Sequence, residues 1–412
     1  MKNKVVLIWF RNDLRLHDNR MLHEAIERNS IIIPVYCFDI RYYQKNKYNY
    51  KNTGIHRARF IRESVIALKK QLQEFNSDLL VFTGLPEEII PKLTAKYNAD
   101  EVYHHREIAA RETAISDKVE NALWAQHINL KHFIGHTLYH KEDLPYSIHE
   151  IPEAFDKFKK ELEKESFLRE TLPAAKSILS PLHLEETQVP DLEDLGFSEK
   201  EITSSAAFRI KSGEHAARAC LKSFCESDDE YIKITHLTPY IAQGLLSPLH
   251  VYKTVEQALS KKDRPHLKSL QNFLLWRDYC RFMLKKHPNV FFKGLPNGTP
   301  DSKNNLCADL WRKGETGIEI IDKAMREIYL QGDTSYHLRK IAGKYFVEES
   351  YSPWLEGAAF FEEYLIDYEP ATLYGYWQHL SGQGTCKKSS KSPGWKKLIK
   401  DYPTQSKNVY SY

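Results

Sequence analysis

The sequence has few of the features that mark secreted, metal-binding and membrane proteins. Six cysteines are scattered through 412 residues without any C-x-x-C pair, which argues against a disulfide framework and against a zinc site. No run approaches the roughly 18 consecutive apolar residues that a membrane-spanning helix needs. The N-terminus also lacks the charged and then apolar segments of an export signal. We therefore expect free thiols, no metal, and a soluble cytoplasmic protein.

Charge of one sign is not in excess, because 59 basic residues face 55 acidic ones for a net charge of +4. A nucleic-acid partner would therefore need a local basic surface. Aromatic residues make up 12% of the chain, which suits stacking on rings but also the packing of a large core. The tail beyond residue 386 is rich in lysine and is either a solvated face or a phosphate contact.

The first 135 residues predict an α/β domain. Apolar runs typical of buried strands lie at 4–9, 31–38, 79–83 and 101–104, with a further candidate at 129–135. Helical stretches separate them, which predicts right-handed crossovers and a parallel sheet covered on both faces. The first strand is not followed by a G-x-G-x-x-G turn, so an ordinary dinucleotide site is not supported.

The rest of the chain predicts a connector and then an all-helical domain. Residues 136–205 include scattered prolines and little periodicity, as expected of a segment between domains. From residue 206 to 412, amphipathic stretches follow one another with short breaks. These stretches lie at 213–226, 247–259, 264–286, 316–331, 334–349 and 354–367.

The most informative stretch is Trp9–Asn19, where two arginines and two aspartates interleave with leucines directly after a strand. On residue types alone, it could be a salt-bridged turn. It resembles, however, the opening of the photolyase and cryptochrome family. The segments 31–39, 84–88 and 137–145 resemble the cryptochrome DASH branch in particular. The similarity covers residues 4–165 and, more loosely, about 205–405.

This resemblance implies a fold with a Rossmann-like parallel-sheet domain and a C-terminal helical FAD-binding domain. It also implies blue-light chemistry, in which a lyase splits cyclobutane pyrimidine dimers, preferably in single-stranded DNA. Such a protein would bind DNA by flipping the lesion into a pocket. We expect a monomer with no membrane partner.

The resemblance also assigns roles to residues of a flavin site. Thr235, Leu237 and Thr238 match the segment that holds the flavin pyrophosphate, although Thr238 could simply cap the helix that Pro239 opens. The remaining flavin contacts are Arg277, the ion pair of Arg339 with Asp367, and Glu369, together with Leu373 beside the reactive N5 nitrogen. Arg339 and Asp367 could equally form a helix–helix salt bridge.

Four further positions complete the predicted site. Trp276 matches the tryptophan that faces a flipped-out dimer, a contact that stacking on an indole would support. Trp377 and Trp354 match the flavin-proximal and middle members of an electron relay, although two buried tryptophans are also ordinary core residues. Glu107 matches the residue that holds the pterin of a folate antenna, here methenyltetrahydrofolate, or it is a solvated helix start.

Several departures keep the function open. Phe273 stands where repair enzymes carry a glutamate, Tyr336 replaces a flavin-binding asparagine, and Leu373 can neither donate nor accept a proton at N5. The relay's surface tryptophan is missing near Asp301. The alternatives to a photolyase are therefore a cryptochrome-type photoreceptor without repair activity and a nucleic-acid-binding protein with a decayed flavin site.

Overall fold

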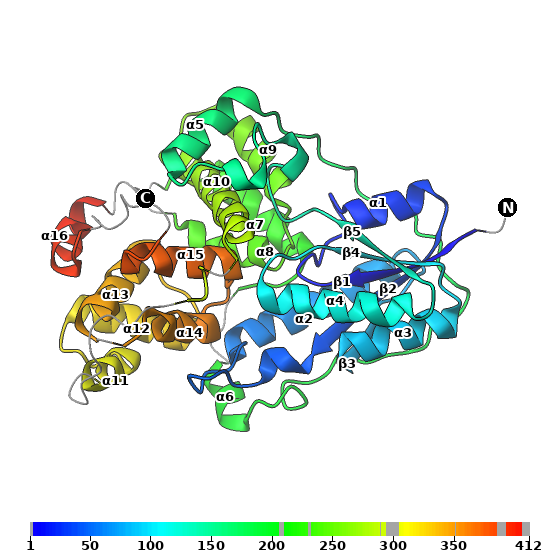
Figure 1. Cartoon of the computed structure of the whole chain (residues 1–412), viewed down its shortest axis with the longest axis horizontal. Helices are drawn as coiled ribbons and strands as arrows, with labels where there is room; N and C mark the ends of the chain where they lie inside the picture. The colour runs from blue at the N-terminus through cyan, green and yellow to red at the C-terminus, as the bar shows by residue number, and fades with distance from the viewer. Residues whose placement is uncertain are drawn as a thin grey trace.

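The computed structural model describes residues 3–205, 210–229, 232–288, 290–293, 305–350, 352–384 and 393–405. It has two parts, an α/β domain and a helical domain, joined by a long segment that runs over the surface (Figure 1). Within the described residues, no helix combines the length and apolar character needed to cross a bilayer.

The α/β domain is built on one parallel sheet of five strands in the order β3-β2-β1-β4-β5. The strands are β1 (Val5–Phe10), β2 (Ile31–Asp39), β3 (Leu80–Gly84), β4 (Glu101–His105) and β5 (Asn129–Phe133). The predicted fifth strand is therefore confirmed. Because the chain passes from β1 outward to β3 and then returns to β4 beside β1, the strand order reverses at β1, where such sheets bind ligands.

Helices cover both faces of this sheet, as the continuous apolar strands require. They are α1 (Arg20–Glu27), α2 (Ile55–Gln73), α3 (Pro86–Tyr97) and α4 (Ala110–Trp124). Side chains alternate along β1: Leu7 and Trp9 pack with α3 and α4, whereas Val6 and Ile8 belong to the larger core that continues into the helical domain.

The charged stretch after β1 is buried rather than solvated. Asp13 and His105 are fully buried, with 2.5 Å between Asp13 Oδ2 and His105 Nδ1. Arg15 is 1% exposed and donates to the carbonyl oxygen of Gly244 at 2.8 Å. Asn19 caps α1 by accepting from Leu22 N. The turn is salt-bridged, as one interpretation held, and it also ties the two domains together.

The helical domain follows the predicted periodicity. Its helices are α7 (Glu214–Glu226), α8 (Thr238–Ala242), α9 (Pro248–Leu259), α10 (Pro265–Lys286), α11 (Asn305–Lys313), α12 (Glu319–Gln331), α13 (Tyr336–Glu349), α14 (Trp354–Tyr364), α15 (Pro370–Ser381) and α16 (Trp395–Gln405). Helix α16 packs on α13, at the edge of the bundle in Figure 1. Of the predicted tail lysines, Lys387, Lys388 and Lys391 lie outside the described residues, as do Cys386 and Asp301.

The segment predicted as a connector, 136–205, contains more structure than its sequence indicated. Helix α5 (Phe155–Glu165) packs against α10, so this part of the predicted connector belongs to the helical bundle. The short helix α6 (Glu199–Ser204) begins with a capping box of Ser198 and Glu201. The stretch between these two helices has no regular secondary structure.

The start of α2 in the α/β domain is hydrogen-bonded to the helical domain. Arg57 is 2% exposed and donates to the carbonyl oxygens of Glu362 at 2.5 Å and Leu365 at 2.7 Å. Gly54 donates its N–H to Glu363 O at 2.9 Å, and a Cβ at that position would overlap the same oxygen. A buried arginine and a close backbone approach thus hold α2 against the end of α14.

Candidate functional site

Helix α10 is the wall between two cavities. Phe273 and Trp276 line a cavity inside the helical domain, whereas Arg277 and Arg281 line a pocket between the domains. Residues three or four apart share one face of a helix, so each pair presents a surface to its own cavity. Every side chain of α10 between Phe273 and Leu284 is buried, which makes it a central helix.

The first of these, the bundle cavity, coincides with the predicted flavin site. It is lined by Phe273, Trp276, Tyr336, Arg339, Phe361, Leu365, Asp367, Tyr368, Thr372, Leu373 and Tyr376. Water molecules fit into only about 30 Å³ of it. Since one water needs roughly 10–15 Å³ by this measure, the bundle cavity holds two or three waters.

The polar anchors of the bundle cavity bind one another. Thr238 Oγ1 donates to Asp367 Oδ2 at 2.6 Å, and Arg339 Nη1 lies 3.0 Å from both Asp367 oxygens. The other end of the guanidinium donates to Asp333 Oδ1 at 2.7 Å and to Thr334 O at 3.0 Å. The predicted pairing of Arg339 with Asp367 is present in the structure.

Aromatic side chains occupy the remaining space. The Arg339 guanidinium lies over the Tyr336 ring, 4.8 Å from its centroid, and that ring lies 5.8 Å from the ring of Phe273. Leu373 is 8% exposed and lines the same wall. The hydroxyl of Tyr376 is buried and has no hydrogen-bond partner among the described residues. The small free volume is enough for a water beside that hydroxyl.

With its side chains in these positions, the bundle cavity has less open space than an isoalloxazine needs. Three fused rings need far more room than two or three waters, and the group predicted to hold the pyrophosphate is hydrogen-bonded to the group predicted beside the rings. The donor set is also wrong, because Leu373 and Phe273 offer no hydrogen bond. Flavin binding would require Tyr336, Leu373 and Tyr376 to move out together.

The pyrophosphate segment itself is only partly as predicted. Thr235 and Leu237 are buried in the turn Ile234–His236 and at its end. Thr238 does not cap α8, because the capping position is Leu237 and the Thr238 hydroxyl turns to Asp367. The capping interpretation is wrong here, because Thr238 is the first residue inside the helix and its hydroxyl donates to a buried carboxylate instead of accepting from the helix N–H groups.

Arg277 and Glu369 are not among the residues that line the bundle cavity. The Arg277 guanidinium donates to the carbonyl oxygen of His136. The Glu369 carboxylate caps α15 by accepting from Thr372 N at 2.8 Å, and it accepts from Arg281 Nη1 at 2.6 Å. Both residues line the pocket between the domains. Of the predicted flavin contacts, the structure thus brings together only Thr238, Arg339, Asp367 and Leu373.

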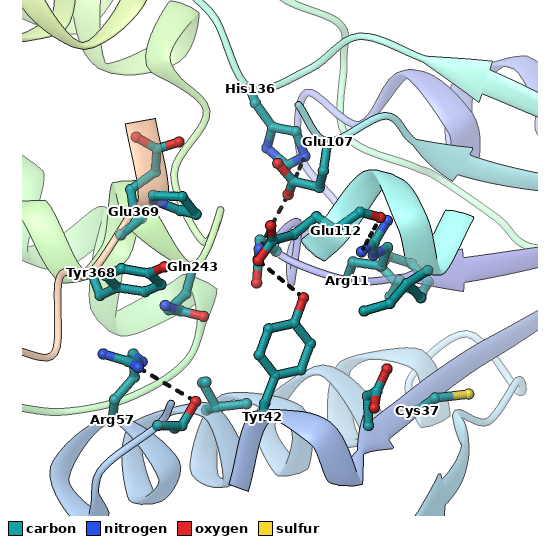
Figure 2. A pocket seen from close by; sticks show the side chains of 18 of the residues that line it. Arg11, Cys37, Tyr42, Arg57, Glu107, Glu112, His136, Gln243, Tyr368 and Glu369 are labelled. Atoms are coloured by element: carbon teal, nitrogen blue, oxygen red, sulfur yellow. Dashed lines mark hydrogen bonds and ion pairs between the residues drawn. The ribbon is translucent and has the colours of Figure 1, made fainter. Parts of the chain in front are cut away.

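The interdomain pocket lies at the carboxyl ends of β1 and β2. In Figure 2, Arg11, Tyr42, Glu107 and Glu112 of the α/β domain face Glu369 of the helical domain, and the Tyr42 hydroxyl points towards Glu112. Water molecules fit into about 90 Å³ of this pocket, against about 30 Å³ in the bundle cavity. It is thus the roomier of the two.

A chain of buried charges crosses this pocket. Arg281 donates to Glu369 Oε1 at 2.6 Å and to Glu107 Oε2 at 3.2 Å, and all three residues are at most 6% exposed. Asn12 Nδ2 donates to Glu107 Oε1 at 3.1 Å. Burial alone would raise the pKa of Glu107, but Arg281, Arg11 and Asn12 together hold it below its usual range. Glu107 is therefore a buried, paired carboxylate rather than a solvated helix start.

Glu112 behaves in the opposite way. It is 4% exposed and lies 3.2 Å from the Tyr42 hydroxyl, which donates to it. Burial outweighs the attraction of Arg111 and raises the pKa of Glu112. Two glutamates of one pocket thus have pKa values shifted apart, because only Glu107 has a charged partner at hydrogen-bond distance. Among the described residues, no group of three or more potential ligands is placed to hold a metal ion.

The predicted tryptophans are all in the core. Trp276 is 6% exposed and packs against Phe155, with ring centroids 5.1 Å apart. Trp354 and Trp377 are 0% exposed. Trp377 contacts the ring of Phe361 at 5.1 Å, and Trp354 contacts Tyr374 at 6.3 Å. Trp276 is too deeply packed, in this arrangement, for a flipped base to stack on it.

Some residues of the site are not predicted from the sequence. Arg281, which joins the charges of the interdomain pocket, lies four residues after Arg277 on an apolar helix, and this spacing was a usable signal. Glu112 had no such signal, because a glutamate on a helix is an ordinary residue, whereas the sequence suggests Tyr376 only as a substitute for the missing member of the tryptophan relay.

Comparison with known proteins gives two family matches, one in the N-terminal part of the chain and one in the helical domain. Residues 6–177 match the DNA photolyase family, and residues 270–396 match the FAD binding domain of DNA photolyase. Cryptochrome DASH of Gloeobacter violaceus is 32% identical, and the match covers 93% of this chain and 80% of that protein. Cryptochrome DASH of Danio rerio is also 32% identical, over 93% of this chain and 78% of the relative.

Solved structures agree with these matches. A cryptochrome of Synechocystis superposes with a TM-score of 0.88 at 32% identity, covering 99% of this chain and 89% of that one. A class III photolyase of Agrobacterium tumefaciens, at 21% identity, shares the fold with a TM-score of 0.83 over 99% of this chain and 86% of its own. The predicted fold class is confirmed, and the chain belongs to the photolyase and cryptochrome family.

Proposed function

We propose that this chain is a nucleic-acid-binding member of its family that works without flavin photochemistry. The observation that carries the proposal is the bundle cavity, in which the centres of water molecules can occupy only about 30 Å³ and whose anchors Thr238, Asp367 and Arg339 bind one another. The family match to DNA photolyase supports nucleic acid as the partner. A preference for single strands is the expectation drawn from the sequence resemblance and is part of this proposal.

Repair of pyrimidine dimers is not favoured by the same geometry. A flipped base would need an open pocket, yet the ring of Trp276 packs against Phe155 and lies 6.1 Å from the ring of His379. Phe273 cannot donate a proton to a lesion. What this chain's residues can do here is stabilise the bundle, because Phe273, Tyr336 and Leu373 exclude water from its centre.

The test is flavin uptake. The purified protein is expected to be colourless and to leave the fluorescence of added FAD unchanged. The variant that combines Tyr336→Asn, Leu373→Asn and Tyr376→Ala, which opens the bundle cavity, should take up FAD and gain absorbance near 450 nm. The wild-type protein should bind a single-stranded oligonucleotide equally in darkness and under blue light.

The matched control replaces residues of the same types on the surface. Tyr329 and Leu330 are 52% and 53% exposed, so the double variant Tyr329→Asn with Leu330→Asn should stay colourless. A yellow wild-type protein that releases FAD on heating would overturn the proposal. So would a failure of the wild-type protein to bind any oligonucleotide.

A flavin photoreceptor is the second candidate, supported by the match of residues 270–396 to the FAD binding domain. In that case, Trp377 and Trp354 would carry electrons to the flavin, and Trp377→Phe would slow photoreduction. Both indoles are fully buried, as a relay through the core requires. The missing surface member falls at Asp301, outside the described residues.

The folate antenna at Glu107 stays a prediction that depends on this second candidate. The Glu107 carboxylate already accepts hydrogen bonds from Asn12 and Arg281. A pterin would have to compete with a buried guanidinium for the same oxygens, which is unfavourable unless it brings a comparable donor. A related photolyase of Sulfolobus tokodaii is described with two FAD molecules, so a second ligand occurs in proteins of this fold.

A further inference from the structure

A third hollow of the molecule differs from the two cavities beside α10. It is an open groove of about 430 Å³, called here the basic groove. Its walls come from α1, from β5 and the loop after it, and from the start of α9. Arg20, Arg106 and Lys141 are among the basic side chains that line it.

The acidic residues of the basic groove are already engaged. Glu24 pairs with Arg28 at 2.7 Å and also with Lys131. Glu170 pairs with Lys253 at 3.3 Å. The other two carboxylates also have partners. Asp18 accepts hydrogen bonds from Leu172 N at 2.8 Å and from the Ser247 hydroxyl. Glu142 forms an ion pair with Arg169 at 3.8 Å. The negative charge of the groove is thus largely neutralised within the protein.

Three cations of the same groove are not neutralised. Arg20, Arg106 and Lys141 are exposed, and no carboxylate of the described residues lies within ion-pair distance of them. Lys285 on α10 is a fourth exposed cation beside them: burial, Lys141 and Arg106 all lower its pKa. Positive charges that repel one another without a counter-charge attract an anion from solution.

The floor of the basic groove is fixed. Arg15 donates to the carbonyl oxygens of Gly135 at 3.2 Å and Gly244 at 2.8 Å, which belong to different domains. A buried guanidinium that bridges two domains keeps the groove walls in place. Ligand binding would therefore cost little rearrangement of the backbone.

We propose that the basic groove binds the phosphate backbone of a single nucleic-acid strand through Arg106, Lys141 and Lys285, with Arg20 farther along. The inference rests on the proposed function and assigns it a surface. A strand is favoured over a small anion because the groove is open and its cations come from separate segments, as in channels that track a backbone. Enclosed pockets suit small anions better.

The salt dependence of binding tests this directly. The variant that combines Arg106→Gln, Lys141→Gln and Lys285→Gln removes three phosphate contacts. The slope of log K against log salt for a single-stranded oligonucleotide should therefore become shallower by about 2, since each contact contributes roughly 0.7. Inorganic tripolyphosphate should compete only weakly, because it spans fewer contacts.

The control removes the same charge elsewhere. Lys92, Lys200 and Lys313 are exposed and lie outside the groove, so replacing all three with glutamine should change the slope far less. A groove variant with the wild-type slope, or a control with the same loss, would overturn the inference alone. A wild-type protein that binds no oligonucleotide would overturn the proposed function as well. If the triple variant does not fold, Lys141→Glu provides the same test with one exposed side chain.

Discussion

The bundle cavity and the interdomain pocket are both lined by side chains of α10, yet they differ in how they are filled. In the bundle cavity, Phe273 packs with Tyr336 and about 30 Å³ remains. In the interdomain pocket, Arg281 joins Glu107 to Glu369 and about 90 Å³ remains. Both cavities contain buried ion pairs, but aromatic and aliphatic side chains fill most of the bundle cavity, whereas charged side chains cross the interdomain pocket.

The largest effect is expected from removing the charge of Arg281 at the centre of the interdomain pocket. Arg281→Met should lower the free energy of unfolding by about 3–5 kcal/mol, because it leaves the carboxylates of Glu107 and Glu369 buried and unpaired. Urea denaturation monitored by tryptophan fluorescence measures the change. As the control, Lys268→Met removes the cation of the exposed Lys268–Asp263 pair. It should lower the free energy of unfolding by no more than about 1 kcal/mol. Equal costs at the two sites would show that the interdomain charges are solvated.

A smaller effect is expected on how the free energy of unfolding depends on pH. The pKa of Glu107 is lowered in the folded protein, so its contribution to stability is present above the unfolded pKa of about 4.3 and is lost as the pH falls through the folded value. Glu107→Gln should therefore lose stability mainly at neutral pH and differ less from the wild type below about pH 4. Denaturation at a series of pH values measures this. The exposed Glu315→Gln variant should follow the wild-type curve, and a constant gap for Glu107→Gln would contradict the charge argument.

The smallest effect on stability is expected from a change in the bundle cavity. Tyr376→Phe removes a buried hydroxyl that has no partner among the described residues, so stability should stay the same or rise by about 1 kcal/mol. Tyr374→Phe is the matched change, since that hydroxyl donates to Glu362 Oε2 at 2.6 Å, and it should lower stability by about 1.5–3 kcal/mol. Equal losses in thermal or urea unfolding would mean that Tyr376 has a bound partner.

The sequence predicts the elements of this fold well because their signals are local. The apolar run at 31–38 became β2 (Ile31–Asp39), and the stretch at 264–286 became α10 (Pro265–Lys286). Period and length decide such elements within a few residues. The pairing of Arg339 with Asp367, which lie 3.0 Å apart, came instead from the resemblance to the family.

The direction of side chains was less predictable, because it depends on residues that are distant in sequence. Arg277 turns to His136, 141 positions earlier, and Thr238 turns to Asp367, 129 positions later. Neither choice leaves a local signal. The substitutions Phe273 and Leu373 showed that the flavin site had lost polar groups, but only the packed arrangement shows that the remaining space is closed.

The fastening of Arg57 onto the end of α14 has a consequence for how the polypeptide can be divided. The guanidinium of an α/β residue satisfies carbonyl oxygens that belong to the helical half. Separating the two halves would expose the guanidinium to water on one fragment and the carbonyl oxygens of Glu362 and Leu365 on the other, so each half would lose buried hydrogen bonds that the whole chain forms.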